Sequence, residues 1–278
     1  MEVIVAKTAG FCFGVKRAVE KVYANVDKEH VYTYGPIIHN EQVVADLEKH
    51  GGKVVEEDTD LTQLSEGTIV VRAHGASRAE FDRLRECGMQ IEDATCPFVS
   101  KIYRIVEEES KAGRTVIIVG NAAHPEVRGI RGWSGEDTYV VGSIEEANNL
   151  NILAKNISIV SQTTFNLKKF KEIVEIFEKK GYDIKCLNTI CNATEVRQTE
   201  ARQIASQVDA MIVIGGKNSS NTQKLFEICK EECSNTYYIQ TAEDLDYTAI
   251  RGMQRIGITA GASTPKNIIE EVQTRCQI

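Results

Sequence analysis

The sequence lacks the features that mark several large classes of protein. No run approaches the roughly 18 apolar residues of a membrane-spanning helix, and the first residues, MEVIVAK, lack the basic start and apolar stretch of a secretion signal. There is also no basic surplus for a nucleic-acid binder, because 33 Lys and Arg face 40 Asp and Glu, a net charge of −7. We therefore expect a cytoplasmic protein that binds neither membranes nor nucleic acids.

The chain also has no segment with the composition of a linker between domains. The 278 residues include only 4 prolines and no low-complexity segment, so composition does not mark domain boundaries. The hydrophobic fraction of 42% and the charged fraction of 26% are those of an ordinary soluble globular protein. A chain of this length can bury an apolar core as one large domain or as two to three small lobes.

Eight cysteines stand out, but no two of them form a CxxC pair. That absence argues against zinc ribbons, thioredoxin-like redox pairs and ferredoxin-type cluster runs. A disulfide framework belongs to short secreted chains, which this sequence does not resemble. Any cysteine chemistry must therefore come from well-separated positions, which are 12, 87, 96, 186, 191, 229, 233 and 276.

An internal repeat organises the chain. A cysteine followed at once by an amphipathic helical pattern occurs three times, and Cys96 lies 84 residues after Cys12 and 95 residues before Cys191. After each of these helices come two β-branched runs, and each run ends in a polar loop that contains glycine. The six segments of strand and loop are residues 31–40, 69–77, 116–126, 157–164, 211–221 and 256–265.

The repeat predicts three α/β lobes. Residues 13–95 would form lobe one and residues 96–190 lobe two. The third unit lacks a short strand that the others have, and the N-terminal run supplies one, so residues 191–278 with 1–12 would form lobe three. Alternating strands and helices imply mostly parallel sheets, which bind ligands at the carboxyl ends of their strands. We therefore expect an α/β fold of three pseudo-repeated lobes around a central cluster cavity.

The three repeat cysteines, Cys12, Cys96 and Cys191, predict a metal site. Three thiolates are one short of a closed four-cysteine cluster site, so we expect a 4Fe–4S cluster whose fourth iron is open to substrate as a Lewis acid. A zinc ion held by three cysteines and a water is an alternative, and a single cysteine of this kind could simply be a small residue at a tight turn. Cys229 and Cys233 share a helical face that permits metal binding, but we expect them, like the other three cysteines, to be core or surface thiols.

Neutral hydrogen-bond donors gather in the same strand-end loops. The set is His39, His74, His124, Ser219, Ser220, Asn221 and Ser263. Together with backbone amides at helix starts, such donors suit a phosphate or diphosphate, even in an acidic protein. The structural alternative for the Ser-Ser-Asn run is capping of the next helix, which uses the same geometry as anion binding.

One carboxylate lies in the core of the second loop. Glu126 directly follows His124 and Pro125. Desolvation in a cluster cavity should raise its pKa, as a proton donor at neutral pH requires. Thr163 could relay that proton to a substrate hydroxyl.

Eight short motifs make the sequence resemble the 4-hydroxy-3-methylbut-2-enyl diphosphate reductases, iron–sulfur enzymes that complete the non-mevalonate isoprenoid pathway. The motifs run in family order from residue 10 to 263, and no motif position departs from the family. They are Gly10-Phe-Cys-Phe-Gly-Val, Gly35-Pro-Ile-Ile-His-Asn, Arg72-Ala-His-Gly-Ala-Ser, Asp93-Ala-Thr-Cys-Pro, His124-Pro-Glu, Gln162-Thr-Thr, Asn218-Ser-Ser-Asn and Thr259-Ala-Gly-Ala-Ser.

The resemblance implies a reaction and a role for each residue. Cys12, Cys96 and Cys191 would hold the cluster, the seven neutral donors and Thr163 would bind the substrate, and Glu126 with Thr163 would deliver protons. The allylic hydroxyl of (E)-4-hydroxy-3-methylbut-2-enyl diphosphate would bind the open iron and leave as water. Two electrons would arrive singly from ferredoxin or flavodoxin, and the products would be isopentenyl diphosphate and dimethylallyl diphosphate.

Two other functions stay open on the residues alone. A dehydrating lyase of the quinolinate-synthase kind also suits three repeats, three cysteines and an open iron, but it needs no net electrons. A non-catalytic iron sensor or zinc-binding module leaves Glu126 and the neutral donors without a purpose. A requirement for a low-potential reductant would distinguish the reductase from the lyase. A metal and sulfide assay would test the iron sensor or zinc-binding module.

Overall fold

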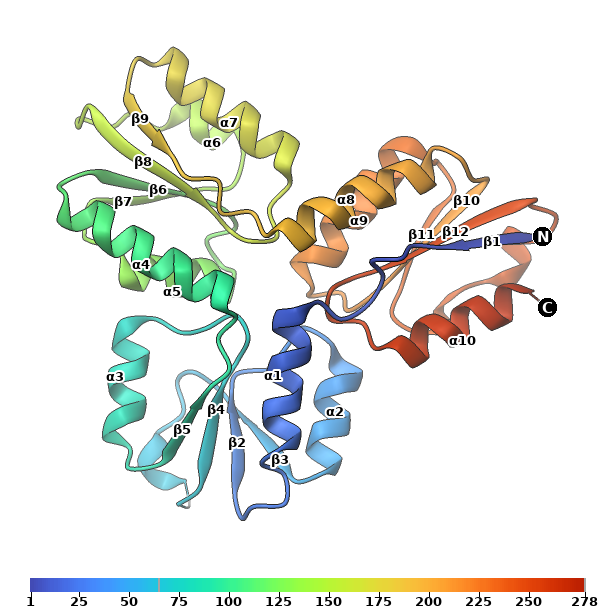
Figure 1. The fold of residues 1–278 in the computed structure, drawn as a ribbon, viewed down its shortest axis with the longest axis horizontal. Helices are drawn as coiled ribbons and strands as arrows, with labels where there is room; N and C mark the ends of the chain where they lie inside the picture. The colour runs from blue at the N-terminus through green and yellow to red at the C-terminus, as the bar shows by residue number, and fades with distance from the viewer. Residues whose placement is uncertain (65, 278) are drawn as a thin grey trace. The chain divides into compact units, whose positions relative to one another are not determined.

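Three four-stranded sheets make up the framework of the protein (Figure 1). The computed structural model describes residues 1–64 and 66–277, which form ten α-helices and twelve β-strands. The strand orders are β3-β2-β4-β5, β7-β6-β8-β9 and β1-β12-β10-β11, and every strand pairing in the described residues is parallel. The predicted α/β fold with three lobes of parallel sheet is therefore confirmed.

The first sheet packs an aromatic core beneath one helix. Its strands are β2 (Val31–Tyr34), β3 (Gly52–Val55), β4 (Thr68–Val71) and β5 (Gln90–Asp93), and the accompanying helices are α1 (Phe13–Tyr23), α2 (Glu41–Lys49) and α3 (Arg78–Glu86). Phe81 and Leu84 of α3 pack against Tyr34 and Ile69 of the sheet. Ser77 caps α3 in a reciprocal capping box with Glu80, which fixes where the loop after β4 ends.

The second sheet is buried on both faces. Its strands are β6 (Thr115–Val119), β7 (Thr138–Val141), β8 (Asn156–Ser161) and β9 (Asp183–Cys186), and its helices are α4 (Pro97–Lys111), α5 (Pro125–Trp133), α6 (Ile144–Asn149) and α7 (Leu167–Lys179). Ile117 and Val119 face a core that includes residues of α7, whereas Val116 and Ile118 face α4 and α5. Figure 1 shows α4 and α5 on one side of this sheet and α6 and α7 on the other. This double burial explains why the strands read as continuous apolar runs.

The N-terminal strand belongs to the third sheet. The strands are β1 (Glu2–Val5), β10 (Ala210–Ile214), β11 (Thr236–Ile239) and β12 (Arg255–Ala260), and the helices are α8 (Asn192–Ala205), α9 (Ser220–Glu232) and α10 (Lys266–Gln277). Strand β1 pairs with β12, with Glu2 opposite Arg255. Three short 3₁₀ helices complete the structure, at Leu61–Gln63, Ala242–Asp244 and Tyr247–Ile250.

The chain divides into two compact units. One consists of Met1–Lys16, Ile38–Asp46 and the residues from Asn192 onward, and it contains the third sheet. The other consists of Arg17–Ile37 and Leu47–Cys191, and it contains the first and second sheets. The lobe bounds 13–95, 96–190 and 191–278 with 1–12 remain a proposal based on the repeat.

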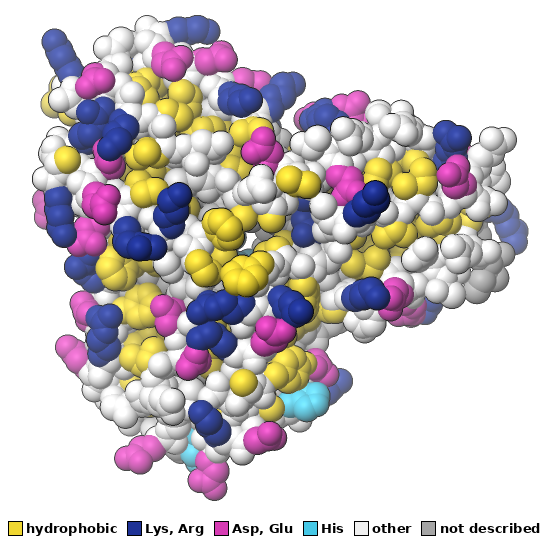
Figure 2. Space-filling model, in the orientation of Figure 1, with side chains coloured by type: hydrophobic (Ala, Val, Ile, Leu, Met, Phe, Trp, Pro, Cys, Tyr) yellow, Lys and Arg dark blue, Asp and Glu magenta, His cyan; other side chains and the backbone are white. Residues whose placement is uncertain are grey.

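The surface carries charges of both signs. Basic and acidic side chains lie interspersed on the face shown in Figure 2, with apolar patches between them. Within the described part of the chain, no helix combines the length and apolarity that a bilayer crossing needs.

A buried arginine joins the N-terminal segment to the third sheet. Arg197 in α8 is only 4% exposed, and its guanidinium donates to the carbonyl oxygens of Ala260 at 2.7 Å and Gly10 at 2.9 Å. Gly10 has a φ of 98°, a left-handed conformation that favours glycine. Arg197 therefore fixes the backbone of the loop that leads into Cys12.

We expect Arg197→Met to lower the free energy of unfolding by about 2–4 kcal/mol, because it leaves two buried carbonyl groups without their donor. Arg202→Met in the same helix is the matched control. Arg202 pairs with Glu231 and Glu232 on the surface, where an ion pair contributes at most about 1 kcal/mol. Urea unfolding followed by circular dichroism measures both variants, and equal losses would contradict the role of Arg197.

Candidate active site

The three repeat cysteines occupy the same local position in the fold. Cys12 directly precedes α1, Cys96 is the N-cap of α4, and Cys191 directly precedes α8. Each cysteine amide donates a hydrogen bond to the carbonyl of the second residue after a strand: Ala262 after β12 at 3.3 Å, Ala73 after β4 at 3.0 Å and Thr163 after β8 at 3.0 Å, respectively. Among the described residues none of the three forms a disulfide, and all three are partly exposed. The thiolate is the form of cysteine that binds metals.

The other cysteines have different surroundings. Cys229, Cys233 and Cys276 are buried, Cys87 is half-buried and Cys186 is exposed. Burial raises the pKa of Cys229 to about 12, with a further contribution from neighbouring Cys233, and burial raises the pKa of Cys276 to about 11. Such thiols stay protonated at neutral pH and pack as small apolar side chains.

Glu126 and Thr163 form a buried pair. Glu126 lies in the first turn of α5 and is 2% exposed. The Thr163 amide donates to Glu126 Oε1 at 2.6 Å, and the Thr163 hydroxyl donates to Oε2 at 2.8 Å. Desolvation raises the pKa of Glu126 to about 7, although both hydrogen bonds from Thr163 act to lower it. The carboxyl can therefore hold or release a proton near neutral pH.

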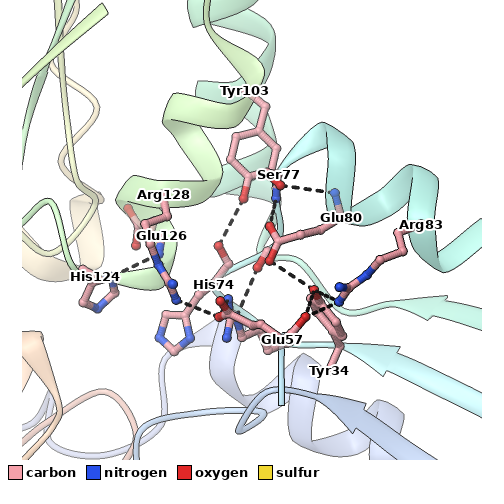
Figure 3. A network of polar contacts seen from close by, with 12 residues as sticks. Tyr34, Glu57, His74, Ser77, Glu80, Arg83, Tyr103, His124, Glu126 and Arg128 are labelled. Atoms are coloured by element: carbon pink, nitrogen blue, oxygen red, sulfur yellow. Dashed lines mark hydrogen bonds and ion pairs between the residues drawn. The ribbon is translucent and has the colours of Figure 1, made fainter. Parts of the chain in front are cut away.

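Two histidines, His74 and His124, lie near Glu126 (Figure 3). His124 is the N-cap of α5, and its Nδ1 accepts a hydrogen bond from the Glu126 amide at 3.1 Å. A neutral His124 therefore carries its proton on Nε2, which can donate to a ligand. The ring of His74 meets the ring of His124 edge to face, with centroids 5.3 Å apart. Strand-end loops of the first and second sheets thus bring two imidazole groups together.

The remaining predicted donors belong to the unit that contains the third sheet. Ser219 is the N-cap of α9, where its Oγ accepts from the Thr222 amide at 3.3 Å, and Ser220 and Asn221 are the first helical residues. Asn221 is 6% exposed, and its buried Nδ2 has no hydrogen-bond partner among the described residues. A buried amide donor of this kind normally requires an acceptor, such as a ligand oxygen. His39 lies in the loop before α2, and Ser263 lies in the loop after β12 and is buried.

A charged cluster that the sequence did not predict holds the loop after β4 (Figure 3). Glu57 Oε1 lies 2.6 Å from buried Arg72 Nη2 and 2.7 Å from Arg128 Nη2. Burial raises the pKa of Glu57, but the hydrogen bonds and charges of the two arginines outweigh it and lower the pKa below its usual value. Arg72 Nε also donates to the carbonyl of Gly75 at 3.3 Å. The cluster therefore positions the backbone next to His74.

The signals for this cluster in the sequence are weak. Arg72 stands inside a quoted motif directly after a buried strand, which is an unusual place for a charge. Nothing near Glu57 distinguishes it from the other acidic residues. Tyr103, whose hydroxyl donates to the His74 carbonyl at 3.2 Å, reads in the sequence as one more core position of a helix.

Comparisons with known proteins agree with one another. The LytB protein family model matches residues 3–277. The 4-hydroxy-3-methylbut-2-enyl diphosphate reductase of Caldanaerobacter subterraneus subsp. tengcongensis is 48% identical over 276 residues, which cover 98% of this chain and 95% of that protein. The protein of the same name from Geobacter sulfurreducens is 47% identical over 278 residues, which cover 100% of this chain and 97% of that protein.

Two solved structures are also similar. The E-1-hydroxy-2-methyl-but-2-enyl-4-diphosphate reductase of Plasmodium falciparum gives a TM-score of 0.93 at 29% identity, covering 99% of this chain and 87% of that one. A structure of (E)-4-hydroxy-3-methyl-but-2-enyl diphosphate reductase, the terminal enzyme of the non-mevalonate pathway, gives a TM-score of 0.70 at 42% identity. That match covers 100% of this chain and 99% of the other.

We expect the Glu126 carboxyl to titrate near pH 7 rather than near its ordinary value of 4.5. Infrared difference spectra of wild type minus Glu126→Gln should show a protonated carboxyl band that disappears with a midpoint at about 7. Thr163→Val removes a hydrogen bond that lowers the pKa, so the midpoint should rise, whereas Thr163→Ser keeps the hydroxyl and is the control.

The same titration affects stability. The folded protein holds the Glu126 proton more tightly than the unfolded chain, so the stability from this group is present below pH 4.5 and is lost as the pH rises to about 7. In the infrared titration, a carboxyl band that vanishes near the ordinary glutamate pKa of 4.5 would contradict the desolvated environment of Glu126.

Proposed function

This chain belongs to the LytB protein family, and from that premise we propose that it catalyses the reductive dehydroxylation of (E)-4-hydroxy-3-methylbut-2-enyl diphosphate. The products are isopentenyl diphosphate and dimethylallyl diphosphate. The observation that carries the proposal is the buried pair of Glu126 and Thr163 in a chain whose relatives at 47–48% identity are named as this reductase.

Cys12, Cys96 and Cys191 are the residues that would hold a 4Fe–4S cluster. Their equivalent positions directly before helices and their partial exposure support this assignment. Zinc also accepts three thiolates, but it does no redox chemistry, and the relatives are reductases. When bound, such a cluster supplies one-electron transfer and one iron position without a protein ligand, which can polarise an allylic hydroxyl.

The neutral donors bind the diphosphate. His124 offers its Nε2 proton, and His74 lies beside it. The start of α9 contributes Ser219, Ser220 and Asn221, whose unpartnered buried amide and helix dipole both favour an anion. We assign His39 and Ser263 to the same ligand on the basis of their strand-end loops.

Glu126 supplies protons through Thr163. When Glu126 is protonated, it can donate to the Thr163 hydroxyl oxygen while that hydroxyl donates to the substrate. The overall reaction takes up two electrons and two protons. The C–O bond breaks, one proton leaves with the hydroxyl as water, and the other forms a C–H bond at either end of the allyl fragment.

The electrons come singly from ferredoxin or flavodoxin. We assign the protein to the cytoplasm. A dehydrating lyase would need no electron donor, which is at odds with relatives that are reductases. The experiment that tests the function is anaerobic turnover of the hydroxylated diphosphate with reduced methyl viologen.

We expect Glu126→Gln to keep the cluster's absorption spectrum but to lose turnover by a factor of about 100 or more, the usual contribution of a positioned proton donor. Glu136→Gln, a replacement of an exposed glutamate beyond the end of α5, is the control and should turn over normally. The viologen assay measures both variants. Near-normal turnover of Glu126→Gln would remove Glu126 from the mechanism.

Replacing Cys229 and Cys233 together by alanine should leave the iron and sulfide content unchanged, because both thiols are core residues. Cys96→Ala should lose most of the iron and sulfide under the same conditions. Chemical determination of iron and acid-labile sulfide after anaerobic reconstitution makes the comparison. Cluster loss in the Cys229/Cys233 variant but not in Cys96→Ala would overturn the choice of ligands.

A further inference from the structure

Large exposed apolar side chains follow the candidate cluster cysteines. The chain has 8 phenylalanines, and among the described residues only Phe13, at 65%, and Phe98, at 46%, are largely exposed. Phe13 directly follows Cys12, and Phe98 lies two residues after Cys96. In α8, Val196 is 46% exposed and lies five residues after Cys191. A single exposed apolar residue is ordinary, but an exposed phenylalanine within two residues of both Cys12 and Cys96 is not.

The face of α4 that carries Phe98 also carries unpaired cations. Lys101 and Arg104 are exposed and follow Phe98 at intervals of three residues, which places the three side chains on one side of the helix. The opposite side, which includes Val99 and Ile102, is buried in the core. Among the described residues, neither Lys101 nor Arg104 forms an ion pair. This helix start is therefore apolar and positive in a chain whose net charge is −7.

A cavity of about 280 Å³ adjoins this face. Arg104 lines the cavity, together with Thr95, which is the residue before Cys96. Thr95 is 4% exposed, and its buried hydroxyl has no hydrogen-bond partner among the described residues. The stacked rings of Tyr103 and Trp133, with centroids 5.4 Å apart, also line the cavity. The charged residues of the lining are Arg85, Asp93 and Arg104, and Arg104, which forms no ion pair among the described residues, can pair with a partner's carboxylate.

We propose that the exposed face of Phe98, Lys101 and Arg104, with the adjoining cavity, is the docking surface of the electron donor. The partner that fits is a small acidic protein that carries one electron at low potential. An aromatic anchor beside arginine is typical of residues that dominate binding energy, and the two unpaired cations complement an acidic partner. This inference rests on the proposed function, because it assumes that Cys96 holds the electron acceptor.

The electron count sets how the surface is used. Each encounter oxidises one donor molecule by one electron and reduces the acceptor by one electron. Two encounters supply one turnover, so the donor must dissociate between them. Docking on a small, partly charged surface suits such short-lived complexes, which bury less area than permanent ones.

The first test compares two reductants on the holoenzyme. We expect Lys101→Glu/Arg104→Glu and Phe98→Ala each to raise the KM for a reduced acidic bacterial ferredoxin by about tenfold, the loss of about 1.4 kcal/mol of binding. Turnover with reduced methyl viologen should stay within about twofold, since a small reductant needs no docking surface. Lys168→Glu/Lys171→Glu on α7 is the matched control, because both lysines are exposed at the same spacing and the charge change is equal.

The second test detects the complex without turnover. Carbodiimide couples a lysine to a contacting carboxylate, so mass spectrometry of the holoenzyme treated with oxidised ferredoxin should find Lys101 in the cross-linked peptide and Lys168 outside it. Raising the salt concentration should weaken the cross-link of wild type more than that of Phe98→Ala/Arg104→Glu.

The outcomes separate the two proposals. Equal losses with ferredoxin and viologen, equal effects of the α4 and α7 variants, or a face that only mediates self-association in sedimentation would overturn the docking surface. A wild-type enzyme that cross-links ferredoxin through Lys101 but turns over with neither reductant would instead overturn the proposed function.

Discussion

One backbone hydrogen bond, made three times, sets the positions on which the candidate site depends. Each runs from a cysteine amide to the second residue after β4, β8 or β12. These strands are buried and parallel to their neighbours, so the sheet cores fix the positions of their ends. The hydrogen bond to a fixed strand end therefore positions each thiol at the start of its helix. At Cys191 the acceptor is Thr163, whose own amide and hydroxyl donate to Glu126. A single residue therefore ties a candidate cluster ligand to the candidate proton donor.

The protonation of Glu126 results from two opposing effects of the same surroundings. Burial raises the pKa, and the two hydrogen bonds from Thr163 lower it, with a result of about 7. A buried carboxyl without those donors would stay protonated at neutral pH, and an exposed one would stay ionised. His124 Nδ1 accepts a hydrogen bond from the backbone amide of Glu126, a contact that does not involve the Glu126 carboxyl.

The sequence predicted the strands and cysteines that repeat along the chain, but not the contacts that join distant segments. Three sheets followed from three equivalent sets of β-branched runs, and the cysteines followed from their position before a helical pattern. The contacts that hold the site do not repeat. Arg197 reaches Gly10 across 187 positions, and Arg128 reaches Glu57 across 71. Glu126 and Thr163 were both predicted as site residues, but their direct hydrogen bonds span 37 positions and depend on how β8 lies beside β6.

Helix α4 shows how one element can serve two purposes. Its N-cap is Cys96, its inner face belongs to the core of the second sheet, and its outer face carries Phe98, Lys101 and Arg104. A donor bound to that outer face would be placed relative to Cys96 by a single rigid turn of helix rather than by a flexible loop. The acidic remainder of the chain strengthens this selectivity, because an acidic partner is repelled wherever cations are not locally in excess. The net charge of −7 then favours one orientation of the acidic donor, against the outer face of α4, and does not prevent the donor from binding there.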